Sequence, residues 1–339
     1  NPNVYIWPGK VVGAGVKVSS NLKYGNVKAE FLNENGFDES GGTRLNSETC
    51  VRLGAAMGNT ENGRKVGIAN DGSRSAEIMQ LAVTAGLAGS GSQVWNFGEC
   101  FEAQLNFLVN FCGLGAGLFI SGKKEKTIKI CGEGGLSIPR FFEREIENGM
   151  SKCEFKEISE SEIKEISDMS SVKLLYSQEL SKQAPYGLQG IGVSFRCPNE
   201  SIRILLENCT ARLGTHESEK LILEIDETGT RVFANTESEK VEYEKLLAVC
   251  CLNEIKNGRD IAVPYDAPAF LDSLAQAYGR KAFRYLATPA DNSDSVARRL
   301  AAKQVFVRDG LFLAVKLLSV MKERECSLEE LLSELPEKY

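Results

Sequence analysis

Short apolar runs and amphipathic helical patterns alternate along most of this chain, and this alternation restricts the fold more than any other feature. Apolar runs at 65–69, 93–97 and 116–120 are separated by helical patterns at 75–87 and 101–111. A buried apolar run followed by an amphipathic stretch is typical of a strand joined to a helix that covers the sheet. We therefore expect an α/β fold with a doubly wound, parallel sheet.

The same alternation recurs twice, over 190–255 and over 260–324, so the sequence predicts three α/β units. A charged stretch from Ser151 to Ser170, rich in serine and glutamate, follows the first unit. We interpret it as a solvated helical connector anchored by isoleucines, and as the first domain boundary. The predicted domains are then residues 31–150, 151–257 and 258–339.

Residues 1–30 have a period of their own. Ile6, Val12, Val18 and Tyr24 are spaced by six, with glycines between them. This spacing is typical of a hexapeptide β-helix, although a pair of strands joined by a glycine turn also fits. About three or more repeats are needed for a stable solenoid. Because the chain also begins at Asn1 and not at Met, we expect the rest of the solenoid to lie upstream.

Charge and composition exclude several classes of function. The 40 lysines and arginines against 46 aspartates and glutamates leave a net charge of -6, which gives no general attraction to nucleic acid or to an anionic membrane. No apolar run approaches the length of a membrane span. The ten cysteines form no C-x-x-C motif, which indicates a reducing compartment. We expect a cytoplasmic protein with neither nucleic acid nor membrane as a partner.

One residue count restricts catalysis. His216 is the single histidine, and it lies in a polar stretch that is typical of a solvated loop. A mechanism that needs a catalytic histidine or a histidine metal cluster therefore has one position available.

The loops that follow the strands are where a sheet of this kind binds ligands. The loop 70–75 contains Asp71, Ser73 and Arg74, for which capping of the next helix is favoured over ligand contact. The loop 121–126 combines a serine with three lysines. Such a set suits a phosphate, but lysine loops are also often only solvated, and no helix begins after this one to add its dipole.

A third loop, 226–231, joins two predicted strands. Its Asp226 and Glu227 have the oxygen ligands that Mg²⁺ prefers. A tight β-turn with Thr-Gly at its tip is the favoured alternative.

Five segments have an order that points further: 46–58, 70–87, 117–122, 223–231 and 308–318. In this order they resemble the α-D-phosphohexomutase family, which includes phosphoglucomutases and phosphomannomutases. The resemblance extends over about residues 37–339. It implies three consecutive α/β/α domains, with the family's fourth domain absent after Tyr339.

The repeat at 1–30 adds to this resemblance. A hexapeptide β-helix that runs into mutase-like domains is similar to the C-terminal half of mannose-1-phosphate guanylyltransferase-like proteins. This similarity implies that 1–30 are the last coils of a left-handed β-helix. It also implies a sugar nucleotidyltransferase domain fused upstream.

The sequence departs from the family where the family performs its chemistry. The family transfers phosphoryl through a phosphoserine in a T-A-S-H-N-P loop, and here the nucleophile position falls on Lys123, which cannot carry the phosphoester. An alignment shifted by one or two residues would place Ser121 there. Of the family's D-x-D-x-D-R metal loop, Asp226 and Arg231 remain. The sugar-binding G-E-x-S-G-H loop has no counterpart between 290 and 307.

These departures lead us to expect a catalytically inactive mutase-like module of a sugar-1-phosphate nucleotidyltransferase of the GDP-mannose type. It would act in assembly, as a homo-oligomer, or in sensing a sugar phosphate through Ser121, Lys123, Lys124 and Arg231. Asp226 would be a vestigial metal ligand, so no cofactor is expected, and Mg²⁺ only if the altered loop still binds it. An active phosphosugar mutase with a rearranged site is the alternative, and a pure scaffold is a third possibility.

Overall fold

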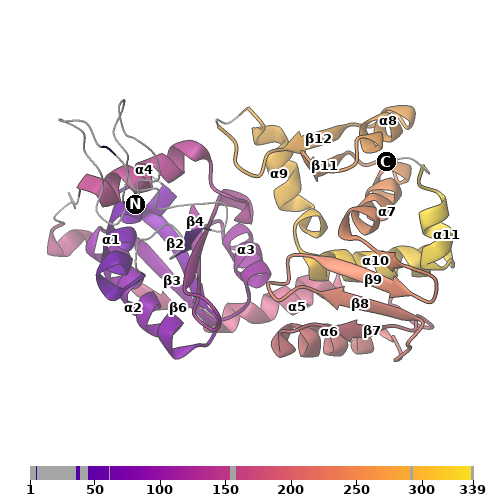
Figure 1. Cartoon of the computed structure of the whole chain (residues 1–339), viewed down its shortest axis with the longest axis horizontal. Helices are drawn as coiled ribbons and strands as arrows, with labels where there is room; N and C mark the ends of the chain where they lie inside the picture. Colours follow the sequence, from indigo (N-terminus) through magenta and orange to yellow (C-terminus); the bar gives the residue numbers. More distant parts are fainter. Residues whose placement is uncertain are drawn as a thin grey trace. The chain divides into compact units, whose positions relative to one another are not determined.

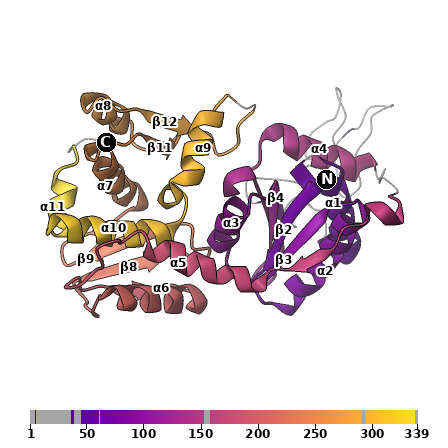
Figure 2. The same cartoon turned by 180° about the vertical axis from the view of Figure 1, so that it is seen from behind.

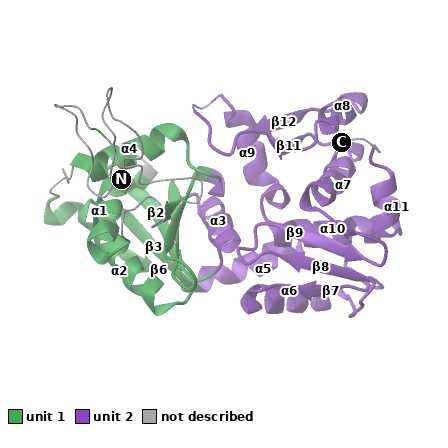
Figure 3. Ribbon diagram, in the orientation of Figure 1, with its two compact units in different colours: residues 1–100, 114–133, 137–170 green, residues 101–113, 134–136, 171–339 purple. Residues whose placement is uncertain are grey.

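The structure is a computed structural model that describes residues 5, 36–38, 45–60, 62–152, 158–290 and 293–336. Apart from Tyr5, the predicted β-helix coils at 1–30 lie outside the described residues. The chain divides into two compact units (Figure 3). Unit 1 contains residues 1–100, 114–133 and 137–170, and unit 2 contains residues 101–113, 134–136 and 171–339. The division into three domains stays a prediction.

Unit 1 is built on one six-stranded sheet with the order β1-β5-β4-β2-β3-β6. Its strands are β1 (Phe37–Asp38), β2 (Lys65–Asn70), β3 (Gln93–Glu99), β4 (Ala116–Ser121), β5 (Thr127–Gly132) and β6 (Ile166–Asp168). β2, β3, β4 and β6 are parallel, as the alternation predicts. β5 runs antiparallel to β4, and β1 antiparallel to β5, so the sheet is mixed and not wholly parallel. Only an antiparallel neighbour can follow β4 through a turn as short as residues 122–126.

In the described part of unit 1, three helices pack around the core: α1 (Ser47–Gly58), α2 (Arg74–Gly89) and α4 (Arg140–Lys152). α1 and α2 lie side by side (Figure 1) and cross at two glycines. A Cβ at Gly54 would lie 2.2 Å from the carbonyl oxygen of Val83, and one at Gly86 would lie 2.1 Å from that of Val51. Larger residues would force the helices apart, so the close crossing depends on these two glycines.

The stretch 151–170 is not the helical connector that its composition predicts. Its described part contains the last two residues of α4, a short 3-10 turn (Glu160–Glu162) and β6, which pairs with β3 at the edge of the sheet, and a second 3-10 turn (Ser170–Lys173) begins at its end. Ile163 and Ile166 do not anchor it, because their side chains are 51% and 49% exposed. At 166–168 the backbone instead pairs with β3.

Unit 2 contains two sheets. The four-stranded sheet has the order β10-β9-β8-β7, and its strands are β7 (Ser194–Arg196), β8 (Leu221–Ile225), β9 (Val232–Thr236) and β10 (Lys240–Val241). β11 (Ile261–Pro264) and β12 (Ala282–Tyr285) form a separate parallel pair. α3 (Glu102–Phe111), which follows β3 in the sequence, also belongs to unit 2.

The other helices of unit 2 are α5 (Leu174–Ser181), α6 (Glu200–Leu213), α7 (Tyr243–Lys256), α8 (Phe270–Ala277), α9 (Ser295–Lys303), α10 (Gly310–Arg324) and α11 (Leu328–Ser333). α7 and α10 pack against β9, and α6 packs against β7 (Figures 1 and 2). No helix in the described part of the chain is long and apolar enough to cross a bilayer.

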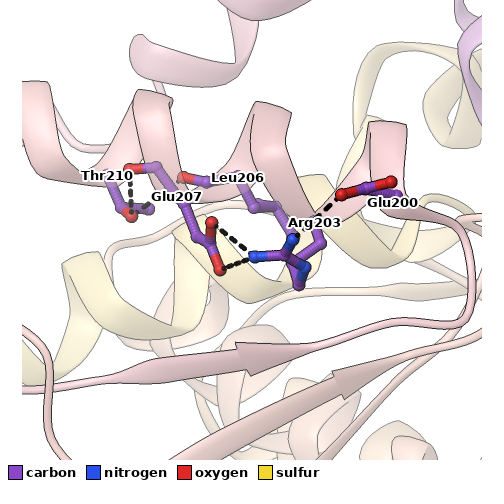
Figure 4. A network of polar contacts seen from close by, with 5 residues as sticks. All are labelled: Glu200, Arg203, Leu206, Glu207 and Thr210. Carbon is purple, nitrogen blue, oxygen red and sulfur yellow. Dashed lines mark hydrogen bonds and ion pairs between the residues drawn. The ribbon is translucent and has the colours of Figure 1, made fainter.

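The exposed surface of α6 has the charge pattern of a solvated helix (Figure 4). Arg203 donates to both oxygens of Glu207 at 2.8 and 2.9 Å, one turn further along, and forms a longer ion pair with Glu200. The Thr210 hydroxyl donates to the carbonyl of Leu206, four residues earlier, at 2.9 Å. Such i,i+4 pairs stabilise the helix itself and leave no charged group of this set directed at a ligand.

Candidate functional site

The two loops that the sequence singles out in unit 1 lie together at the carboxyl edge of its sheet. β2 and β4 are parallel neighbours, so the residues that follow Asn70 and Ser121 emerge at the same edge. The backbone N–H of Asp71 donates to the carbonyl of Ile120 at 3.0 Å and extends this pairing by one residue. The loop 70–75 therefore contacts the lysine loop 121–126.

Asp71 is the residue that joins the two loops. One of its carboxylate oxygens, Oδ2, accepts from the Ser121 hydroxyl at 2.8 Å, from the Gly122 N–H at 2.9 Å and from the Lys123 N–H at 3.0 Å. The other, Oδ1, accepts from the Ser73 N–H at 3.0 Å. The backbone N–H groups at the start of the lysine loop therefore already have the Asp71 carboxylate as their acceptor. Capping of the following helix, the role predicted for this loop, belongs to Ser73, whose Oγ accepts from the N–H of Ala76 at 3.4 Å.

These contacts also determine the charge of Asp71. Burial alone would raise the pKa of its carboxyl, but hydrogen bonds from Ser73, Gly122 and Ser121 outweigh burial and lower the pKa to about 2. A carboxylate with so low a pKa is a poor proton acceptor at neutral pH. Ser121 is therefore held by a hydrogen bond but is not activated as a nucleophile.

The start of α2 lies against the lysine loop. Ser75 donates its hydroxyl to the carbonyl of Gly122 at 3.3 Å, and a Cβ at Gly122 would lie 2.1 Å from that hydroxyl oxygen. No helix follows this loop in the sequence, which by itself disfavours an anion site. The structure supplies a helix N-terminus from a distant part of the sequence, which is favourable for negative charge.

The exposed rim of this region is cationic. Lys123, Lys124 and Lys126 are exposed in the loop, and Arg74 is exposed in the first turn of α2. An anion can be attracted by these side chains, whereas the amides of Gly122 and Lys123 already donate to Asp71. The site is therefore suited to binding a phosphate group at its surface, and it lacks the free amide cradle that holds a phosphate deeply.

A buried chain of amides supports this edge from beneath, and the sequence argument did not find it. The Asn70 side chain donates to Gln80 of α2, and Gln80 donates to Asn96 of β3 at 2.6 Å. Asn70 and Asn96 also accept the N–H groups of Gly72 and Gly98 at 2.7 and 2.8 Å. Asn70 is the last residue of β2, whereas Asn96 lies in the middle of β3, so the two share no position that the sequence would single out. The network links these two strands to α2.

The predicted metal loop lies in unit 2, as the turn between β8 and β9. We call residues 226–231 the Asp226 turn. Oδ2 of Asp226 accepts from the hydroxyls of Thr228 at 2.6 Å and Thr230 at 3.1 Å, and Oδ1 accepts from the Arg231 N–H at 3.1 Å. Glu227, the other carboxylate of the turn, is exposed.

This donor set does not fit Mg²⁺. Magnesium in proteins prefers carboxylate oxygens in an octahedral arrangement, whereas here a single carboxylate is surrounded by hydrogen-bond donors. Among the described residues, no group of three or more histidine, cysteine, aspartate or glutamate side chains is arranged to hold a metal ion. The favoured prediction for this loop, a tight β-turn, agrees with its geometry.

The structure brings together only part of the predicted binding set. Ser121, Lys123 and Lys124 belong to the lysine loop of unit 1. Arg231 is an exposed residue of unit 2, where its guanidinium lies 5.4 Å from the centre of the Tyr243 ring and 3.9 Å from a carboxylate oxygen of Glu244. Neither unit by itself contains all four residues. His216 is exposed, as predicted for a solvated loop.

Comparison with known proteins finds a family similarity in the first part of the chain. Residues 32–157 match the family model described as phosphoglucomutase/phosphomannomutase, alpha/beta/alpha domain I. The chain is phosphohexomutase-like. The family resemblance drawn from the order of the loops is confirmed at this level.

Curated relatives of this phosphohexomutase-like chain are phosphoglucosamine mutases. A probable phosphoglucosamine mutase of Pyrococcus abyssi is 28% identical over 138 residues, which are 40% of this chain and 31% of that protein. The phosphoglucosamine mutase of Caldicellulosiruptor saccharolyticus is 24% identical over 297 residues, 82% of this chain and 64% of that protein. The chain thus spans about a third of the length of the first relative and less than two thirds of the second.

Solved structures share the fold over more of the chain. A phosphoglucomutase/phosphomannomutase family protein of Burkholderia thailandensis has a TM-score of 0.70 at 15% identity, covering 87% of this chain and 77% of that chain. A putative phosphomannomutase of Thermus thermophilus has a TM-score of 0.66 at 16% identity, covering 91% and 84%. The phosphohexomutase-like fold therefore extends beyond the domain I match.

Proposed function

We propose that this phosphohexomutase-like chain binds a sugar phosphate at its lysine loop without transferring the phosphoryl group. The observation that carries the proposal is the Asp71 carboxylate, which accepts the Gly122 and Lys123 amides at 2.9 and 3.0 Å. These amides begin the loop in which the family resemblance places the nucleophile. The carboxylate brings a fixed negative charge to the place where a second one, a phosphoserine, would have to form.

The remaining chemistry supports the same proposal. Phosphoryl transfer depends on an in-line nucleophile and on cations that neutralise the developing charge. Lys123 stands at the nucleophile position, and Ser121 donates to a carboxylate whose pKa of about 2 makes it a weak base. In the Asp226 turn, Asp226 is the one carboxylate that remains at the positions of the family's three metal ligands. An active mutase with a rearranged site would need a nucleophile and a charge-neutralising group from elsewhere.

We further propose that the chain serves as the mutase-like module of a sugar-1-phosphate nucleotidyltransferase of the GDP-mannose type. The six-residue spacing at 1–30 and the order of the mutase-like segments support this assignment. In that setting the module acts in assembly, as a homo-oligomer, or as a sensor of the sugar phosphate that the enzyme uses. A cytoplasmic location fits such an enzyme.

Binding is tested by thermal shift and isothermal calorimetry with mannose 1-phosphate, glucose 1-phosphate and glucosamine 6-phosphate. We expect millimolar ligand to raise the melting temperature. The double variant K123A/K124A should weaken binding by about tenfold, since each exposed ion pair contributes up to about 1 kcal/mol. The control K220A/K303A removes two exposed lysines outside the loop and should bind like the wild type. Absence of any shift, or equal binding by K123A/K124A, would reject the site.

Catalysis is tested separately, by intact mass spectrometry after incubation with a sugar bisphosphate and by a coupled assay for interconversion of 1- and 6-phosphates. We expect neither a phosphorylated protein nor Mg²⁺-dependent turnover. A phosphoserine at Ser121, with turnover that S121A abolishes, would establish the active mutase in place of our proposal.

A further inference from the structure

The Asp226 turn has a second set of contacts, made by its backbone carbonyls. The carbonyl of Thr228 accepts from the Ala103 N–H in the first turn of α3 at 3.1 Å, and that of Gly229 accepts from the Gly310 N–H at the start of α10 at 2.9 Å. Two consecutive residues of the turn thus hold two helices of unit 2 that are far apart in the sequence.

The preceding residues of the turn extend this pattern. The carbonyl of Asp226 accepts from the Cys197 thiol at 3.4 Å, and that of Glu227 accepts from the Asn199 side chain at 3.4 Å. Both donors lie between β7 and α6, and Asn199 is also the N-cap of α6. Four consecutive carbonyls therefore contact three parts of unit 2, and the carbonyl of Asp226 also accepts from the Gly229 N–H within the turn at 3.2 Å.

The fit around the turn leaves little freedom to change its shape. A Cβ at Gly310 would lie 2.6 Å from the backbone carbonyl carbon of Arg231, and one at Gly229 would lie 3.0 Å from the ring of Phe101. Gly229 has a φ of 77°, which other residues seldom adopt. A turn packed this closely has to be held in one conformation from within.

Contacts between side chains inside the Asp226 turn hold it in this conformation without a bound ion. The hydroxyls of Thr228 and Thr230 lie 2.6 and 3.1 Å from the same oxygen of Asp226 and 2.7 Å from each other. Because each hydroxyl has one proton, two of these three contacts are hydrogen bonds at any time, and they bring partial positive charge to the oxygen atom that a cation would use. A cation would have to displace both hydroxyls and would gain one carboxylate in return.

We propose that the Asp226 turn is a metal-independent clasp, in which the hydroxyls of Thr228 and Thr230 do the work of a divalent cation and fasten α3, α6 and α10 within unit 2. The clasp concerns folding, so it is independent of whether the lysine loop of unit 1 binds a sugar phosphate.

The first test removes the two hydroxyls. T228V/T230V keeps the shape of both side chains but leaves the Asp226 carboxylate without these donors. We expect a clear fall in the urea midpoint and in the melting temperature, equal in EDTA and in millimolar Mg²⁺. The control T236V removes a threonine hydroxyl from the neighbouring exposed hairpin, where it contacts Ser238 and Glu239, and should change little. Unchanged stability of T228V/T230V, or a wild type that EDTA destabilises, would overturn the proposal.

The second test exchanges the hydroxyls for carboxylates. T228D/T230D adds two carboxylates beside that of Asp226, and these repel one another in the absence of a cation. We expect this variant to be much less stable than the wild type in EDTA, to regain stability in Mn²⁺, and to bind Mn²⁺ in electron paramagnetic resonance titrations where the wild type does not. Binding of Mn²⁺ by the wild type that D226N abolishes would overturn the proposal, whether or not T228D/T230D folds.

Discussion

The carboxylate of Asp71 accepts a hydrogen bond from the hydroxyl of Ser121 at 2.8 Å, although the two residues are 50 positions apart in the chain. The same oxygen atom also accepts the next two backbone N–H groups. The start of the lysine loop is therefore organised by a carboxylate of its own chain. This relationship determines what the loop can bind and leads to the first prediction.

Replacing Asp71 by asparagine should destabilise unit 1 by about 2 kcal/mol, because hydrogen bonds to a charged acceptor are worth about 1.5–3 kcal/mol. The side-chain NH₂ group of the asparagine would also face the O–H and N–H groups that donate to Asp71 in the wild type. Urea unfolding followed by the fluorescence of Trp95 measures the change. Asp168 caps the Ser170 N–H at 2.9 Å from an exposed position and provides the matched control D168N, which should cost far less. Equal costs for the two variants would contradict the role given to Asp71.

The pH dependence of stability should carry the signature of the same carboxylate. The folded-state pKa of Asp71 is lowered from 3.8 to about 2, so its contribution is complete above about pH 4 and is lost as the pH falls toward 2. We expect the stability difference between wild type and D71N to shrink over this window. Unfolding measured at a series of pH values gives that difference directly, and a constant difference would show that Asp71 is not the titrating group.

Asp309 should behave in the opposite way. It is buried at the N-cap of α10, where it accepts from the Tyr176 hydroxyl and from the N–H groups of Leu311 and Phe312. Burial raises its pKa to about 6, against the opposing effects of these donors and of the Arg308 charge. The folded state therefore holds this proton more tightly than the unfolded state, and the stability contributed by Asp309 falls as the pH rises from about 4 through 6.

The variant D309N removes the titration while an amide oxygen still caps the helix. We expect D309N to gain stability relative to the wild type as the pH rises from 4 to 7. Y176F removes a donor to the carboxylate and should therefore cost more above pH 6 than below pH 4. Parallel pH profiles for wild type, D309N and Y176F would refute the assignment.

Gly310 gives a prediction about packing. A Cβ at this position would meet the backbone of Arg231, which belongs to the Asp226 turn, so G310A should separate α10 from the turn and cost more than about 2 kcal/mol. Gly89, in the last turn of α2, has nothing within 4 Å of its added Cβ. The control G89A should be neutral or stabilise by up to about 1 kcal/mol, since alanine is the better helix former. Thermal unfolding of the two variants decides whether space or helix propensity dominates at Gly310.

Much of the fold was predictable from local patterns. The apolar runs at 65–69, 93–97 and 116–120 correspond to β2, β3 and β4, and a capping box formed by Ser327 and Glu330 begins α11. Period and capping are short-range properties that a single segment carries within itself. β5 was missed because its pairing with β4 depends on a turn and not on its own apolar content.

The candidate site was predictable in its residues but not in its contacts. The serine and lysines of the loop 121–126 were apparent, as were Asp71 and Asp226. That the backbone N–H groups of this loop donate to Asp71 was not apparent, because Asp71 reaches them across the parallel pair of β2 and β4. Nor did the sequence reveal that the start of α2 would lie beside a loop that no helix follows.

The sequence by itself determined the class of fold and the family resemblance, and it led to the prediction that the nucleophile and the metal ligands are lost, because each of these depends on which residue stands at which position. Only the tertiary structure decided that Asp71 takes the place of an anion at the lysine loop and that two threonine hydroxyls satisfy Asp226 in a turn that holds three elements. Hydrogen bonds form between atoms within about 3 Å. For the Asp71 contacts that proximity is created by the pairing of strands, and for the carbonyls of the Asp226 turn by the packing of helices.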